Sequence, residues 1–245
     1  MEVINRPDYT EKVKKLFGKG FIIALTGQRR VGKSFIMRQV IKELSQDSAA
    51  HVIYIDKDNE EFSFVQSHEE LTKYVKSNLL SNKRNYLFVD EIQNIKEFEV
   101  SLRSFHTNDE CEMVITGSNA KMLSSELSTY LSGRCVEYHI QSLDYREFLT
   151  FHRLSDNNQS LHSYLKYGGL PQLHRIGLEE TELVDDYLKS VYHTIVLKDV
   201  IEREEIRNVP LLKNLIRFVG DNVGKVFSAS SIVKYLKSQQ VDSST

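Results

Sequence analysis

The chain has 245 residues, of which 40% are hydrophobic and 27% are charged, and these ordinary globular values exclude an intrinsically disordered protein. Because 32 basic side chains stand against 34 acidic ones, the net charge is −2, which excludes a uniformly basic nucleic-acid coat protein but allows a local basic patch. Two cysteines are too few for a disulfide framework or a thiolate metal site. The longest clean apolar run, residues 21–25, falls far short of the ~20 residues of a membrane-spanning helix. We therefore expect a soluble, cytoplasmic protein without a membrane partner.

Five short apolar runs are typical of strands, and they cover residues 21–25, 51–56, 85–90, 112–117 and 135–140. Several are almost continuously apolar, as expected for strands that are covered on both faces of a parallel sheet. The segments between them have helical spacing, at residues 35–44, 67–79 (opened by a capping box of Ser67 and Glu70), 98–105 and 122–131. Strands that alternate with helices indicate βαβ units. The predicted fold class is α/β, with a parallel five-stranded sheet flanked by helices.

No further strand pattern follows residue 140, and helices are predicted over residues 144–152, 159–167 and 179–207, with a break at Gly168–Pro171. Charge changes along this part, with nine acidic and three basic residues over 179–205 but six basic and one acidic over 207–237. The last residues, two amphipathic helices and a hydroxyl-rich ending, are typical of the start of a winged helix. We expect three parts, a core over 1–140, an all-helical lid over 141–207 and an incomplete winged-helix-like segment over 208–245.

Residues 27–34 read GQRRVGKS, which fits the phosphate-loop pattern G-x-x-x-x-G-K-[ST], between a predicted strand and a predicted helix. Gly27 and Gly32 permit the turn whose N–H groups cradle the β-phosphate, beside the positive end of the helix. Lys33 reaches the β- and γ-phosphates, and the Ser34 hydroxyl is a magnesium ligand. The pattern predicts binding of ATP with Mg²⁺ by a continuous stretch that also includes Gln28, Arg29, Arg30, Val31 and Phe35.

A pair of acids follows another apolar strand, in the segment YLFVDEIQ at residues 86–93. Asp90 is positioned to hold the Mg²⁺ shell, and Glu91 to polarise the attacking water. The Asp-Glu pair indicates hydrolysis of the phosphoric anhydride by an activated water. The chain contains no NKxD guanine signature, which favours ATP over GTP.

Two further elements each leave a functional and a structural interpretation open. In MVITGSNA, residues 113–120, either Ser118 or Asn119 faces the γ-phosphate, or both are polar residues that end a strand. In LSGRC, residues 131–135, Arg134 follows a glycine. It is either an arginine finger, acting in the same chain or from a neighbouring subunit of a homo-oligomer, or a plain surface charge.

Seven segments occur in an order that resembles uncharacterised prokaryotic AAA-type ATPases, and they are RPDY (6–9), GQRRVGKS, LFVDEIQ, ITGSNA, LSGR, YREF (145–148) and YGGLP (167–171). The resemblance implies a P-loop core followed by a helical region, a winged helix and, in many members, a nuclease-like C-terminal region that is missing here. It also implies that Arg6 and Pro7 lie near the adenine and that Arg134 is the finger-like arginine.

The resulting hypothesis is an AAA-type ATPase that couples its nucleotide state to a C-terminal effector or DNA-binding region. The alternative is a nucleotide-gated DNA-binding switch with slow turnover, in which the ATP-bound state is the signal. A two-domain helicase is disfavoured because the chain has one phosphate loop. We also expect the natural protein to extend beyond residue 245 and DNA to be a partner through the winged helix.

Overall fold

The computed structural model describes residues 4–117, 131, 133–199, 201, 206 and 208–238. Its sheet is built from β1 (Ile22–Thr26), β2 (Ala50–Asp56), β3 (Arg84–Asp90), β4 (Glu112–Thr116) and β5 (Cys135–His139). The helices that accompany the sheet are α1 (Pro7–Lys14), α2 (Lys33–Leu44), α3 (His68–Asn78) and α4 (Phe98–Thr107), with short 3₁₀ turns η1 (Glu60–Phe62) and η2 (Ile92–Asn94). The five predicted strands are confirmed to within about one residue at each end, and the predicted helix over 122–131 lies outside the described residues except for Leu131.

The five strands form one sheet in the order β2-β3-β4-β1-β5, and every neighbouring pair is parallel. Two parallel strands are joined by a connection that crosses over the sheet, and the intervening helices form these connections. The carboxyl ends of the strands therefore all lie at one edge. The register pairs Asp56 of β2 with Asp90 of β3, and Thr26 of β1 with His139 of β5.

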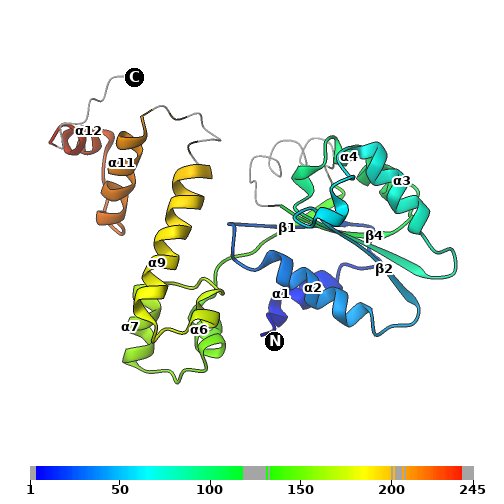
Figure 1. Cartoon of the computed structure of the whole chain (residues 1–245), viewed down its shortest axis with the longest axis horizontal. Helices are drawn as coiled ribbons and strands as arrows, with labels where there is room; N and C mark the ends of the chain where they lie inside the picture. Colours follow the sequence, from blue (N-terminus) through cyan, green and yellow to red (C-terminus); the bar gives the residue numbers. More distant parts are fainter. Residues whose placement is uncertain are drawn as a thin grey trace. The chain divides into compact units, whose positions relative to one another are not determined.

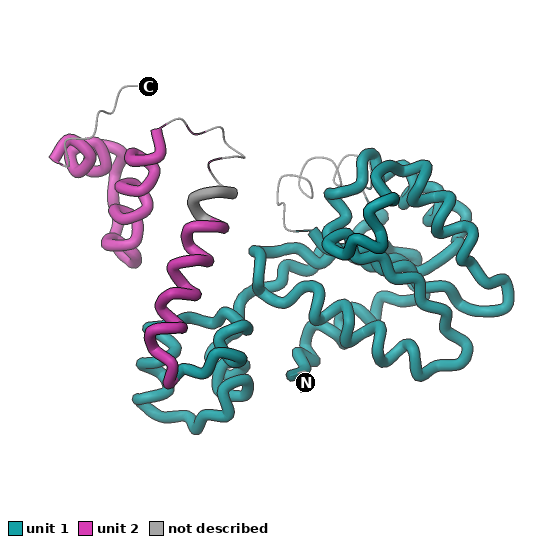
Figure 2. Tube along the Cα trace, viewed as in Figure 1, with its two compact units in different colours: residues 1–178 teal, residues 179–245 magenta. Residues whose placement is uncertain are grey.

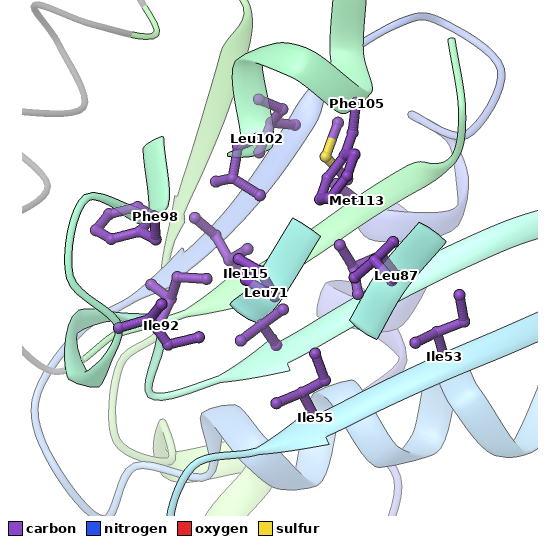
Figure 3. Packing of buried hydrophobic residues seen from close by; sticks show 14 of the residues in the cluster. Ile53, Ile55, Leu71, Leu87, Ile92, Phe98, Leu102, Phe105, Met113 and Ile115 are labelled. Carbon is purple, nitrogen blue, oxygen red and sulfur yellow. The ribbon is translucent and has the colours of Figure 1, made fainter. Parts of the chain in front are cut away.

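Each strand divides its side chains between two cores because successive residues point to opposite faces. Toward α3 and α4, the first core contains Ile22 and Ala24 of β1 together with the residues labelled in Figure 3. Toward α1 and α2, the second core contains Ile23 and Leu25 with Met37 of α2. Figure 1 shows the two helix pairs on opposite faces of the sheet. This double cover explains why β1 is fully buried and reads as a continuous apolar run.

Three helices follow the sheet in the same compact unit, α6 (Tyr145–His152), α7 (Asn158–Tyr167) and α8 (Leu173–Ile176). A small core of Leu143, Phe148 and Phe151 holds them together. As the GGLP break predicts, α7 ends at Tyr167, and Gly168 takes a positive φ of 73° at its C-cap. The chain divides into two compact units, residues 1–178 and residues 179–245 (Figure 2). The expected division into a core over 1–140, a helical lid over 141–207 and a winged-helix-like segment over 208–245 stays a prediction.

The second unit contains α9 (Thr181–Val191), α11 (Val209–Asp221) and α12 (Ala229–Ser238). The helical pattern predicted over 179–207 is helical in most of its described residues, because α9 continues as a π-helical segment, η4, over Tyr192–Asp199. Helices α11 and α12 pack through Phe218, whose ring lies 5.0 Å from that of Tyr235. Within the described part of the chain, every helix is too short or too polar to cross a bilayer.

Candidate functional site

The predicted phosphate loop connects the carboxyl end of β1 to the first residue of α2. Gly27 takes a φ of 124°, and a Cβ built on it would lie 2.2 Å from the Ile140 carbonyl oxygen, so only glycine fits. Gly32 is the N-cap of α2 with a φ of 98°, and no side chain caps this helix end. The backbone N–H groups and the positive end of a twelve-residue helix are thus left for an anion.

The first residue of α2, Lys33, has a buried side chain and is 5% exposed. Its Nζ donates to the carbonyl oxygens of Gly27 at 2.9 Å and Gln28 at 3.0 Å, so the side chain folds back over the loop. Burial lowers the pKa of the Lys33 ammonium, and the carboxylates of Glu91 and Asp90 raise it in part. The loop therefore concentrates positive charge directly beside the two predicted acids.

Asp90 ends β3 and is 2% exposed. Its carboxylate accepts a hydrogen bond from the hydroxyl of Thr116, at the end of β4. Burial raises the pKa of Asp90, the hydroxyls of Thr116 and of Ser34 in the first turn of α2 lower it, and the nearby charges of Asp56 and Glu91 raise it. The fold thus brings oxygen atoms of β3, β4 and α2 near one another.

Glu91 follows Asp90 in a left-handed backbone conformation with a φ of 54°. Its N–H donates to Thr116 Oγ1 at 2.9 Å, and its carboxylate accepts a hydrogen bond from Gln93 Nε2. A non-glycine residue with positive φ is uncommon and costs free energy, so the surrounding contacts must hold it. Glu91 thus ends the strand conformation of β3 directly after Asp90, with its backbone held by Thr116 and its carboxylate by Gln93.

The donor set suits a small divalent cation. The Ser34 hydroxyl is near enough to the Asp90 carboxylate to lower its pKa, and hard oxygen atoms of this kind are the ligands that Mg²⁺ prefers. Asp56, the register neighbour of Asp90, adds a second carboxylate, which Arg38 pairs at 3.1 Å. The pKa of Asp90 is raised mainly because its negative charge is buried, and a bound cation would compensate that charge.

Arg6 and Pro7 have different environments. Pro7 is the first residue of α1 and is exposed, whereas Arg6 is buried. The Arg6 guanidinium pairs with both carboxylate oxygens of Glu147 and donates to the carbonyl oxygens of Val31 and Gln141. Their proximity to adenine stays a prediction, and the structure adds a set of protein contacts for Arg6 that the sequence did not suggest.

Three further predicted residues are Ser118, Asn119 and Arg134. Ser118 and Asn119 lie outside the described residues. Arg134 directly precedes β5 and is exposed, and its carbonyl oxygen accepts from Ile22 N at 2.8 Å, at the amino end of β1. The phosphate loop starts at the other end of β1, about 13 Å away along the strand. Arg134 and the phosphate loop of its own chain thus lie at opposite ends of β1, and the arginine-finger role stays a prediction.

Sequence reasoning missed Thr116, Gln93 and Glu147. Thr116 belongs to the predicted segment 113–120. Only the register of β3 with β4 shows that Thr116, the last residue of β4, contacts Asp90. Gln93 is two residues from Glu91, and a helical or strand periodicity contains no sign of that contact. Glu147 was visible as the second half of a capping box with Asp144, a signal that explains its place in α6 but not its pairing with Arg6.

The chain is similar to known families and proteins. Residues 19–149 match the model of a family described as "AAA domain", and residues 158–245 match a family described as "Domain of unknown function (DUF8612)". An uncharacterized protein of Haemophilus influenzae is 32% identical over 251 residues, which cover 99% of this chain and 62% of that protein. An uncharacterized protein of Methanocaldococcus jannaschii is 28% identical over 88% of this chain and 50% of its own length. The chain thus spans only about half to three fifths of these relatives.

Solved structures resemble the chain at the level of the fold. The crystal structure of a DNA replication initiation factor has a TM-score of 0.50 and 14% identity, and it covers 97% of this chain and 89% of that one. The extended conformation of the S. cerevisiae Hsp104:casein complex has a TM-score of 0.51 and 15% identity over 97% of this chain and 49% of that one. Identities this low indicate shared architecture only.

Proposed function

The chain belongs to the AAA domain family of P-loop ATPases, and on that premise we propose that it binds ATP with Mg²⁺ at residues 27–34 and hydrolyses it. We further propose that the nucleotide state is coupled to the helices that follow the sheet. The observation that carries the proposal is the meeting of Lys33, Ser34, Asp90 and Glu91 at one edge of the sheet. Their separate segments are brought together by the parallel register.

Each residue has a role that its contacts support. The loop N–H groups and Lys33 bind the phosphates, for which Lys33 exchanges its two carbonyl acceptors for phosphate oxygens. Ser34 and Asp90 hold Mg²⁺, which when bound neutralises charge on the β- and γ-phosphate oxygens. Glu91 takes a proton from the attacking water, and Gln93 orients the Glu91 carboxylate.

Coupling to the following helices is supported by a contact beside the loop. A Cβ built on Gly32 would lie 3.9 Å from Cγ of Pro171, in the YGGLP segment between α7 and α8. Gly169 in the same segment packs against Leu143, whose N–H donates to the Gly169 carbonyl at 2.7 Å. A shift of the loop on nucleotide binding is therefore transmitted directly to the connection between two helices.

Calorimetric titration of ATP with Mg²⁺ into Lys33→Ala tests the binding step. Truncation leaves phosphate charge uncompensated in a partly desolvated site, and such losses cost several kcal/mol, so we expect no measurable binding. The matched control is Lys14→Ala, which removes a partly buried lysine that pairs with Glu11 and Glu43 on the same side of the sheet as α2. Undiminished ATP affinity in Lys33→Ala would contradict the proposal.

A nucleotide-gated DNA-binding switch is the second candidate, and it rests on the charge of residues 208–238 within the second unit. Residues 208–238 carry five basic side chains, Lys213, Arg217, Lys225, Lys234 and Lys237, against the single acid Asp221. A surplus of this kind favours contact with a phosphate backbone. ATP hydrolysis measured with and without duplex DNA separates the two functions, because a switch turns over slowly and its ATP-bound form binds the duplex.

A further inference from the structure

We propose that Arg6 is a positioning residue for the phosphate loop, which it holds in its phosphate-binding conformation and ties to α6. The inference rests on the proposed nucleotide binding at residues 27–34. In this role Arg6 does not touch the nucleotide but contacts the peptide that joins Val31 to Gly32 in the loop.

The side chain of Arg6 is 4% exposed, and its guanidinium donates four hydrogen bonds. Nε and Nη2 donate to the two oxygens of Glu147 at 2.7 and 2.8 Å, and Nη1 donates to the carbonyl oxygens of Val31 at 3.1 Å and Gln141 at 3.0 Å. A buried guanidinium is stable only with its charge paired and its donors satisfied. Arg6 thus joins three segments, namely the phosphate loop, the exit of β5 and the first turn of α6.

The contact with Val31 acts on the phosphate-binding groups because of peptide geometry. The Val31 carbonyl and the Gly32 N–H belong to one planar peptide that is trans, and in such a peptide they point in opposite directions. A donor that holds the Val31 oxygen therefore fixes the direction of the Gly32 N–H, one of the loop donors. Gly32 itself does not hold this plane, because glycine populates positive and negative φ about equally and a flip of the peptide is sterically allowed.

Arg6 is itself held in place on both sides. Its N–H donates to Gln39 Oε1 at 3.4 Å, and Gln39 Nε2 donates to the Ile4 carbonyl at 2.9 Å, so α2 anchors this segment. The Tyr9 ring lies 4.6 Å from Cζ. On the other side, the Glu147 carboxylate also accepts from Asp144 N at 3.1 Å within the capping box of α6. A movement of α6 away from the loop must therefore break the pair and release the Val31–Gly32 peptide.

Arg6→Lys tests this role, because lysine keeps the charge but is a single-point donor that cannot reach three acceptors in fixed geometry. The Gly32 N–H serves the β-phosphate in ground state and transition state alike, and a loss of such uniform binding raises KM without lowering kcat. We expect KM for ATP, and the calorimetric Kd for ADP with Mg²⁺, to rise at least ~10-fold, with kcat within ~3-fold of the wild type. A merely structural arginine would instead lower the folded fraction and hence the apparent kcat.

Arg84→Lys is the matched control, since Arg84 pairs with Glu112 at 2.5 Å at the amino end of β3, away from the loop, and its KM should not change. If Arg6→Lys does not fold, Glu147→Gln replaces it, because glutamine at this position still completes the capping box while the Arg6 pair is lost. Glu147→Gln should raise the Kd for ADP at least ~3-fold. Wild-type KM and Kd in the folded variant would overturn the role of Arg6, whereas a wild-type protein that binds neither nucleotide would overturn the proposed function instead.

Discussion

Thr116 is a single buried hydroxyl with two partners in the candidate site. It donates to the Asp90 carboxylate and accepts from the Glu91 N–H at 2.9 Å, so it fixes both acids at once. Because it is the last residue of β4, its position follows from strand register and not from a flexible side chain. At the scale of single residues, this hydroxyl determines where the two acids point.

We predict that Thr116→Val lowers ATP turnover by ~10-fold or more, because an isosteric methyl leaves the Glu91 N–H without its partner and removes one hydrogen bond from the Asp90 carboxylate. Each unsatisfied buried group costs about 1–3 kcal/mol, which also lowers thermal stability. Thr116→Ser keeps the hydroxyl and serves as the control. Steady-state hydrolysis and thermal unfolding are the measurements, and equal turnover in the two variants would show that the hydroxyl is not needed.

At the scale of elements, glycine allows two backbone segments to come into direct contact. The GGLP connection approaches the exit of β5 so closely that a Cβ on Gly169 would lie 2.1 Å from the Leu143 carbonyl oxygen. Real atoms do not approach to this distance, and the obstacle is backbone, which cannot move aside as a flexible side chain can. This contact joins α7 and α8 to the sheet at the same edge as the phosphate loop.

Gly169→Ala is therefore expected to lower the free energy of unfolding by about 1–3 kcal/mol, the usual range for overpacking, and to weaken ATP binding through the displaced connection. Gly220→Ala is the control, since nothing lies within 4 Å of its added Cβ in α11, and alanine favours the helix by up to ~1 kcal/mol. Urea unfolding followed by circular dichroism compares them. A Gly169→Ala protein as stable as the wild type would rule out the close contact.

The elements were predictable from local sequence to very different degrees. Strands such as β1 and β3 were predicted because burial on both faces leaves a continuous apolar run, and the phosphate loop because its glycines, lysine and serine stand at fixed spacing. The Arg6–Glu147 pair joins residues 141 positions apart, and no periodicity records a contact at that separation. The edge at which Arg134 lies depends on strand direction and register, which only the folded sheet defines.

On the scale of the whole molecule, the position of Arg134 decides how it can act. It precedes β5 at the amino edge of the sheet, opposite the phosphate loop of its own chain. An arginine finger from this edge has to serve a neighbouring subunit, whose carboxyl edge then faces it. Such a head-to-tail contact joins two different surfaces of the subunit, and repeated contacts of this kind form a ring if the rotation between subunits closes.

Mixing Arg134→Ala with Glu91→Gln protein tests this arrangement. Each variant supplies the group that the other lacks, so we expect a mixed oligomer to recover part of the ATP turnover, up to ~25% of the wild-type rate for randomly mixed pairs by the mixing statistics of two subunit types. Sedimentation of the wild-type protein with ATP monitors assembly. A mixture no more active than the better single variant means that Arg134 has no role across subunits.

The central claim is that this edge of the sheet hydrolyses ATP with Glu91 as the base, and Glu91→Gln tests it most directly. Glutamine preserves shape and the ability to hydrogen bond but cannot accept the proton of the attacking water, and general-base catalysis contributes about 10²–10⁴-fold. We predict that the variant binds ATP with Mg²⁺ within ~2-fold of the wild-type affinity by calorimetry while its hydrolysis rate falls at least ~100-fold. Hydrolysis at the wild-type rate by Glu91→Gln would contradict the account.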